Sequence, residues 1–260
     1  MAYPDEALGS VHLFQPEPYT IHHPLHTAIM CELLANRLEY TKEQRIPIIA
    51  ASLTSNIAML ELQEILHHQE TPLSAEQKKQ INEHPELGAQ MLKEAGVNDP
   101  QWIKMVGQHH ERLDGKGYPE GLSGDEIHSA VQIISIADRY GAMVSTRSYR
   151  EPMTTKRVLR EFFLTKGVEL DERIILSFIK ELSIFPPGTF VKLNNDETVV
   201  VIKRNKNSMW PTVCSIQGPN GSYYAHPLQR ETDKDPYTIK DAVSTQVKIN
   251  TSLKNLWGYD

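Results

Sequence analysis

Residues 108–122 read Gln-His-His-Glu-Arg-Leu-Asp-Gly-Lys-Gly-Tyr-Pro-Glu-Gly-Leu, and this stretch decides how the rest of the chain is interpreted. The adjacent pair His109 and His110 ends a predicted helix and is followed by glycines. Glycine lets the backbone turn sharply, and neutral imidazole is the commonest metal ligand. Glu111 could orient one of the two rings through a hydrogen bond. Without further context, such a pair is more often two surface histidines than a metal site.

Helical apolar spacing fills the chain on both sides of this stretch, from residue 23 to residue 184. Several helix starts are predicted from their sequence. Thr41 and Ser74 are each followed three residues later by glutamine, which is typical of a capping box. Asp99 precedes a proline, a pattern that favours the first turn of a helix. Asp125 is predicted to cap a helix that runs through IHSAVQIISIADRYGAM.

The pattern changes from helical to β-like after residue 185. The segments TFVKL, ETVVVIKR and PTVCSIQ are separated by NND and NKN, which are typical turn sequences. We therefore expect an N-terminal extension over residues 1–18, a helical domain over 19–185 and a small β-rich subdomain over 186–260. The predicted fold class is mainly α, a helical bundle followed by a small C-terminal β subdomain.

The composition is that of a soluble globular protein. The 260 residues are 40% hydrophobic and 23% charged, and the net charge is -6, which excludes wholesale disorder and argues against nucleic-acid binding. No uninterrupted apolar run reaches the roughly 20 residues of a membrane span, and the N-terminus lacks the features of a signal peptide. The two cysteines are far apart, as in proteins of a reducing compartment. We expect a cytoplasmic protein that binds neither nucleic acid nor a membrane.

The string HHExxDGxGYPxGL resembles the signature of the HD-GYP family, a branch of the HD phosphohydrolases that hydrolyses cyclic di-GMP. The resemblance covers about residues 19–184 and implies an HD-domain helical bundle. It extends to the segments YTIHHPLHTAIMCELL, INEHPELGAQML and IISIADRYGAM. It implies the following metal ligands: His23, His84, His109, His110 and Asp138.

Two of these positions can also be interpreted from their neighbours in the sequence. The apolar neighbours of Asp138 favour an inward-facing carboxylate, which would need a partner. The first ligand falls on His23, but His22 and His26 are close enough in sequence to be alternatives.

The name-giving HD pair of the family is replaced in this chain. AASLTSNIAMLELQEIL aligns with a segment that reads AALLHDIGK in the family, so Thr54, Ser55 and Ala58 stand at its His, Asp and Lys positions. In the family this aspartate bridges two cations, which in two-metal hydrolases lie about 3.5–4 Å apart. A neutral hydroxyl is a poor ligand for a divalent ion. We therefore expect no intact catalytic pair and either no metal or a single divalent ion, Zn, Fe or Mn.

Two further segments bear on ligands and partners. Residues 146–150 resemble the family's TSDRPYRK stretch, which implies that Arg147 and Arg150 bind nucleotide phosphates through their guanidinium groups. Gly117, Tyr118 and Pro119 form the GYP loop, which in the family is linked to docking with diguanylate cyclase (GGDEF) domains.

We interpret the chain as a degenerate HD-GYP protein of bacterial cyclic di-GMP signalling. It would act by binding a partner, such as a GGDEF-domain diguanylate cyclase, with cyclic di-GMP as a second candidate ligand. Two alternatives remain open. One is an active cyclic di-GMP phosphodiesterase with a mononuclear metal site, and the other is a scaffold without nucleotide affinity.

Overall fold

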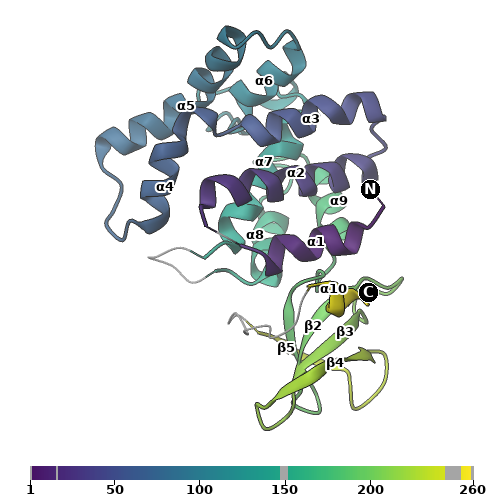
Figure 1. Cartoon of the computed structure of the whole chain (residues 1–260). Helices are drawn as coiled ribbons and strands as arrows, with labels where there is room; N and C mark the ends of the chain where they lie inside the picture. The colour runs from purple at the N-terminus through teal and green to yellow at the C-terminus, as the bar shows by residue number, and fades with distance from the viewer. Residues whose placement is uncertain (1, 16, 147–151, 244–252, 259–260) are drawn as a thin grey trace. The chain divides into compact units, whose positions relative to one another are not determined.

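The computed structural model describes residues 2–15, 17–146, 152–243 and 253–258 (Figure 1). Contacts between residues divide the chain into two compact units. Residues 15–152 and 160–181 form a helical unit, and residues 1–14, 153–159 and 182–260 form a unit that contains a β-sheet. The predicted fold class, mainly α with a small C-terminal sheet, is confirmed. These contacts place residues 1–14 in the same unit as the sheet, whereas the sequence analysis divides the chain into the consecutive segments 1–18, 19–185 and 186–260.

The helical unit is built from α-helices and two short 3-10 helices. In chain order these are α2 (Tyr19–Arg37), α3 (Lys42–Thr54), the 3-10 helix η1 (Ile57–Met59), α4 (Leu60–His68), α5 (Ala75–Glu94), α6 (Pro100–Gln108), the 3-10 helix η2 (Gly124–Glu126), α7 (Ser129–Val144), α8 (Thr155–Thr165) and α9 (Glu172–Leu182). The first residues of α8 and the last residue of α9 group with the sheet.

Helix α7 is the core of the helical unit. Its residues Ile133, Ile134, Ile136 and Ala137 are fully buried, and it packs against α2, α3 and α6. A helix that is apolar on all sides is stable only when other elements surround it. Asp138 follows directly in this sequence, so its carboxylate is held inside the unit, as the sequence predicted.

Three of the predicted helix starts are confirmed and one is wrong. Thr41 and Ser74 form capping boxes, and the Asp99 carboxylate accepts hydrogen bonds at the start of α6. Asp125 lies instead in η2, and the side chain of His128 caps α7 by accepting from the Ala130 amide. The cause is Ile127, which is buried and has an extended backbone between the two helices. The helix can therefore begin only after it.

The sheet has five antiparallel strands in the order β4-β3-β2-β1-β5. The strands are β1 (Phe190–Leu193), β2 (Thr198–Lys203), β3 (Thr212–Gln217), β4 (Tyr223–Glu231) and β5 (Ile239–Ala242). The three strands expected from the sequence are β1, β2 and β3. The other two extend the sheet at its edges.

Both faces of the sheet are covered within its own unit. On β2, Val199 and Val201 belong to one apolar cluster, and Val200 and Ile202 belong to another. The second cluster receives Leu13, which ends helix α1 (Pro4–Leu13), and also residues of α10 (Leu253–Trp257). Helix α1 therefore contributes Leu13 to this core.

Within the described residues, Lys42–His68 is the stretch with the length and hydropathy of a membrane span. Core helices of soluble proteins pass the same test. In the structure the stretch is divided into α3, η1 and α4, and α3 packs against α2, α6 and α7.

Candidate functional site

Helices α2 and α7 bring His23 and Asp138 together. The Nε2 of His23 lies 2.9 Å from Oδ1 of Asp138, and both side chains are buried. One face of the His23 ring is covered by Tyr19, which stacks on it with ring centres 4.8 Å apart. Burial alone would raise the pKa of Asp138, but the hydrogen bond from His23, together with the charges of His23, His110 and His109, outweighs it, and the pKa is well below its usual range. Asp138 is therefore a carboxylate at neutral pH.

This pairing selects His23 among the neighbouring histidines of α2. His22 and His26 are also buried, and their rings lie next to one another 5.2 Å apart. His23 lines the same small cavity as Asp138, and neither His22 nor His26 does so.

Three other histidines form a cluster from α5 and the end of α6. The ligand nitrogens of His84, His109 and His110 all lie within 4.8 Å of one another. Nδ1 of His84 lies 2.6 Å from the Ile81 carbonyl oxygen, and Nδ1 of His109 lies 2.8 Å from that of Val106. Because a carbonyl oxygen can only accept, each Nδ1 carries the proton and each Nε2 keeps its lone pair.

The two lone pairs face each other. Nε2 of His84 lies 3.2 Å from Nε2 of His109, and both rings are buried. Two acceptors at this distance repel unless a cation lies between them. Nitrogens bound at about 2.0–2.1 Å to one tetrahedral zinc ion are about 3.3 Å apart. The cluster therefore fits a single cation, with His110 as a third ligand.

The pKa values of the three rings favour metal binding. Burial lowers the pKa of His84 to about 3, and the neighbouring His109 adds to the effect. Burial also lowers the pKa of His109, and it lowers the pKa of His110 well below its usual value. Since only a neutral imidazole can donate its lone pair to a metal, all three rings are ready to bind one at neutral pH.

The residues at the HD positions do not face this cluster. The Thr54 hydroxyl donates to the Ala50 carbonyl and accepts from the Trp102 indole at 2.8 Å. The Ser55 hydroxyl donates to the Ser52 carbonyl at 3.3 Å. Ala58, in η1, offers only a methyl group. None of these three side chains lines the cavity.

Asn56 is the residue of this segment that does reach the site. Its Nδ2 lies 3.2 Å from Oδ1 of Asp138, the same oxygen that His23 contacts. Asn56 is buried and lines the cavity. An amide N–H is a donor and cannot bind a cation, so it neutralises part of the carboxylate charge without a metal. Our sequence analysis did not identify Asn56 as a site residue. The signal was present, because Asn56 replaces the isoleucine of AALLHDIGK by a polar residue.

The GYP loop closes the cavity beside the histidine cluster. Tyr118 stacks on His110 with ring centres 4.7 Å apart, and Pro119 next to it is exposed. A Cβ on Gly117 would lie 2.5 Å from the Arg112 amide nitrogen, so only glycine allows this approach. The Tyr118 ring is thus part of the cavity wall, whereas Pro119 presents the outer side of the loop.

Glu111 has a different role from the one expected. Its fully buried carboxylate accepts from the backbone amides of Glu120, Gly121 and Leu122 at 2.7, 3.2 and 2.9 Å. It orients no histidine ring in these contacts. The expectation was wrong because the loop folds back over Glu111, which places three orphan N–H groups at its carboxylate.

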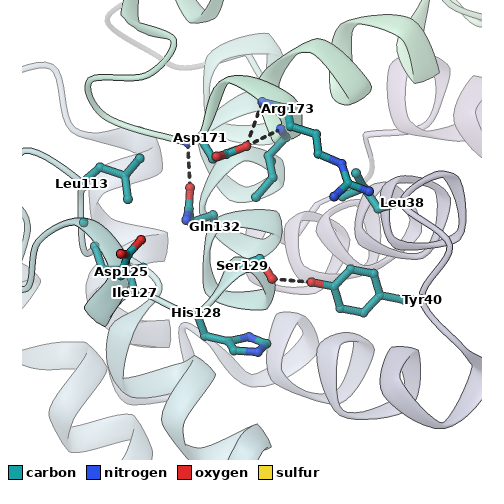
Figure 2. A pocket seen from close by; sticks show the side chains of 12 residues that line it. Leu38, Tyr40, Leu113, Asp125, Ile127, His128, Ser129, Gln132, Asp171 and Arg173 are labelled. Carbon is teal, nitrogen blue, oxygen red and sulfur yellow. Dashed lines mark hydrogen bonds between the residues drawn. The ribbon is translucent and has the colours of Figure 1, made fainter.

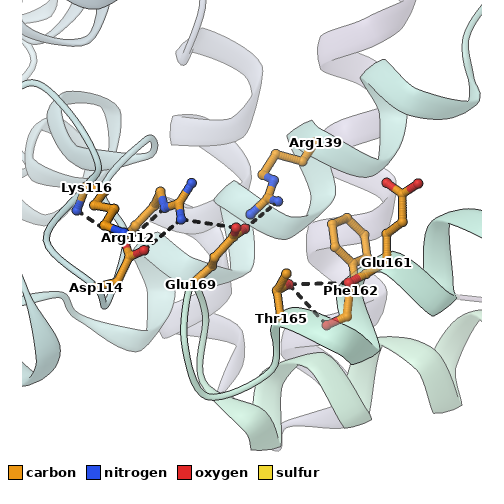
Figure 3. Close-up of polar contacts among 8 residues, drawn as sticks. All are labelled: Arg112, Asp114, Lys116, Arg139, Glu161, Phe162, Thr165 and Glu169. Atoms are coloured by element: carbon orange, nitrogen blue, oxygen red, sulfur yellow. Dashed lines mark hydrogen bonds and ion pairs between the residues drawn. The ribbon is translucent and has the colours of Figure 1, made fainter.

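An ion-pair network supports the same loop from outside. Arg112 contacts Asp114 at 2.7 Å and Glu169 at 3.1 Å, and Glu169 also contacts Arg139 at 2.7 Å (Figure 3). Arg139 follows Asp138 on α7, so Glu169 connects the loop to the helix that carries the buried carboxylate.

The cavity between these groups has a volume of about 170 Å³. Of the five predicted ligands, His23, His84, His110 and Asp138 line it; His109 does not line it, but its ring lies next to those of His84 and His110. The predicted phosphate-binding residues Arg147 and Arg150 lie outside the described residues.

A second cavity of about 510 Å³ lies elsewhere in the helical unit (Figure 2). Its polar groups are largely paired with one another. Gln132 accepts from the Asp171 amide at 2.7 Å, Asp171 caps the start of α9, and the Tyr40 and Ser129 hydroxyls share a hydrogen bond. We therefore assign the functional site to the smaller cavity.

Comparison with known proteins identifies the family of the helical unit. The sequence matches the HD domain family over residues 13–174. A cyclic di-GMP phosphodiesterase of Pseudomonas aeruginosa is 25% identical over 209 residues, which cover 80% of this chain and 50% of that protein. The 3'3'-cGAMP-specific phosphodiesterase 3 of Vibrio cholerae is 28% identical over 169 residues, which cover 65% and 36%. The chain thus spans about a third to a half of the length of these relatives.

The solved structure of Bd1817, an HDG"Y"P protein from Bdellovibrio bacteriovorus, has a similar fold. The TM-score is 0.53 at 18% identity, and the match covers 62% of this chain and 51% of that one.

Proposed function

This chain belongs to the HD domain family, and we propose that it is of the HD-GYP type and acts in cyclic dinucleotide signalling as a binding protein without a complete two-metal centre. The named activities of its relatives on cyclic di-GMP and cGAMP support a cyclic dinucleotide as the ligand. The observation that carries the non-catalytic part is the contact between Asn56 and Asp138.

The contact matters because a two-metal hydrolase needs carboxylates that face both cations. Asp138 has His23 and Asn56 as hydrogen-bond donors on the same oxygen. Thr54 and Ser55 are bonded to backbone carbonyls of their own helix. A second cation beside the histidine cluster would therefore lack a bridging carboxylate, and its repulsion with the first would not be offset.

The second candidate is a phosphodiesterase with a mononuclear metal site. It is supported by the facing lone pairs of His84 and His109 and by His110 beside them. A bound Zn, Fe or Mn ion would act there as a Lewis acid toward a phosphate oxygen. In this case His84, His109 and His110 would hold the ion, and hydrolysis would depend on them.

The ligand contacts and the partner are also proposals. Arg147 and Arg150 would bind the phosphates. The GYP loop would dock a GGDEF-domain diguanylate cyclase or another signalling protein in the cytoplasm. The exposed position of Pro119 supports a docking role for the outer side of this loop. A pull-down with a GGDEF domain, in which Pro119→Asp abolishes binding, tests this contact.

Calorimetry and a phosphodiesterase assay on the same preparation test the function. We expect heat of binding with cyclic di-GMP or 3'3'-cGAMP, and no turnover with added Mn²⁺ or Fe²⁺. Turnover that His109→Ala abolishes would contradict the binding-protein proposal and favour the second candidate. If the protein binds neither nucleotide, both the binding-protein proposal and the phosphodiesterase candidate fail.

A further inference from the structure

Gln63 is a buried polar side chain whose carbonyl oxygen has no partner in the described part of the chain. It is 6% exposed, lines the 170 Å³ cavity, and its Oε1 accepts no hydrogen bond. A buried amide oxygen without a partner is destabilising, so such groups are rare and need an explanation. A ligand in the cavity that donates a hydrogen bond to Gln63 supplies one.

The surroundings of Gln63 indicate the shape of that ligand. Met59, Gln63 and Leu66 are spaced four and three residues apart, and all three line the cavity. Ile81 lines it from α5. The amide is thus flanked by apolar side chains, which is the arrangement that contacts a flat ring on its faces and reads its edge by hydrogen bonds.

The size of the cavity limits the ligand to one ring system at this position. Pockets that hold a whole drug-sized ligand have roughly 300–1,000 Å³, and this one has about 170 Å³. One base of a dinucleotide would enter, while the phosphates and the second base would lie outside it.

We propose that Gln63 reads the edge of a purine base of a cyclic dinucleotide. A carboxamide presents an acceptor and a donor side by side, and glutamine is known to pair in this way with adenine. The same pair matches the N1–H donor and O6 acceptor of guanine. The cavity therefore accepts either purine. This inference rests on the proposed function, because it names the base contact of the same site.

The experiment compares the dissociation constants of cyclic di-GMP and cyclic di-AMP for the full chain and three variants. Gln63→Leu removes the amide while keeping the volume, and we expect both nucleotides to bind about tenfold more weakly or worse, since a bidentate base contact discriminates by roughly 1–3 kcal/mol. Gln63→Glu offers only acceptors. Guanine can donate N1–H and N2–H to a carboxylate, whereas adenine can donate only N6–H. We therefore expect the preference for cyclic di-GMP to rise.

Gln80→Leu is the matched control, because Gln80 is exposed on α5 and contacts Glu76. It should bind both nucleotides like the wild type. The thermal midpoint gives an independent readout. Gln63→Leu replaces an orphan polar group by an apolar one and should melt at or above the wild-type temperature. A purely structural glutamine would lower it.

Three results would overturn the inference. If Gln63→Leu binds both nucleotides like the wild type, Gln63 makes no base contact, while the proposed function stands. If Gln63→Leu binds more weakly but Gln63→Glu keeps the wild-type preference, the amide does not read the base edge. If the wild type binds neither of these nucleotides and does not bind 3'3'-cGAMP, the proposed function fails and the inference fails with it.

Discussion

The amide nitrogen of Asn56 lies 3.2 Å from the Asp138 carboxylate, on the oxygen that also pairs with His23. This carboxylate oxygen therefore has two hydrogen-bond donors within the chain. On the other side of the cavity, the lone pairs of His84 and His109 meet at 3.2 Å. The two sides of the site therefore differ. The Asp138 side has hydrogen bonds within the chain, and the lone pairs of the histidine side are placed to bind one cation.

Loss of one histidine should remove the metal. We expect His109→Ala to weaken binding of Zn²⁺ or Mn²⁺ by more than the roughly 10–100-fold that the loss of a supporting hydrogen bond to a ligand costs. The dissociation constant measured by titration with a competing chelator checks this. His226→Ala, at an exposed position on β4, is the control and should bind metal like the wild type. Equal metal affinity in His109→Ala would exclude the cluster as the site.

A carboxylate at position 55 should be costly without metal. Ser55 is 1% exposed, and Ser55→Asp would bury a charge that has no cation to pair with. Uncompensated buried charge costs about 3–5 kcal/mol, so the free energy of unfolding should fall by several kcal/mol in chelator. Ser55→Ala, which removes the hydrogen bond to the Ser52 carbonyl and the long one at 3.5 Å from the Asn56 amide, should lose about 1 kcal/mol. Denaturant titrations measure both. If Ser55→Asp is as stable as the wild type in chelator, the side chain at position 55 is accessible to water and its charge is not buried.

Glu111 should control the order of the GYP loop. Glu111→Ala leaves the amides of Glu120, Gly121 and Leu122 without their acceptor, and we expect a loss of about 3 kcal/mol or more in local stability. Hydrogen exchange at residues 120–122 should become faster. The matched control is Glu120→Ala, at an exposed position of the same loop that contacts Gln108. Unchanged exchange in Glu111→Ala would mean that the loop is held by its other contacts.

His12 should make the sheet-containing unit sensitive to acid. Its Nδ1 lies 2.8 Å from the Pro187 carbonyl oxygen, and burial lowers its pKa from 6.5 to about 4. The unfolded chain therefore binds more protons between these values, and stability falls as the pH is lowered from about 6.5 to about 4. The loss attributable to His12 is about 3 kcal/mol at most.

The variant His12→Asn keeps an N–H donor near Pro187 but does not titrate in this range. Its stability should vary less with pH across the window, as measured by urea unfolding at half-unit steps. His226→Asn, exposed on β4, should keep the wild-type slope. An identical slope in His12→Asn would show that other groups cause the acid sensitivity.

Local sequence signals predicted those parts of the fold that depend on local contacts. The capping boxes at Thr41 and Ser74 formed because their partners are three residues away in the chain. Asp125 failed because the buried Ile127 delays the start of α7. Strand β4 was not predicted because the segment around Pro227 has no apolar alternation, and its pairing with β3 decides its conformation.

The site shows the same distinction between local and distant contacts. The cluster of His84, His109 and His110 could be predicted because a motif marked each residue. The roles of Asn56 and Gln63 could not be predicted, because the groups near these side chains come from helices that are distant in the sequence. The role of Glu111 depends on how the loop returns over it, which no spacing rule encodes.

The most direct test of the account is the number of metal ions per chain, measured by elemental analysis of protein equilibrated with excess Zn²⁺, Mn²⁺ or Fe²⁺ and then desalted. The geometry of His84 and His109, together with the closed half-site at Asp138, predicts at most one ion per chain. It also predicts that His109→Ala lowers this value to near zero. Two ions per chain, with both lost on mutation of Asp138, would contradict the account and restore a two-metal hydrolase.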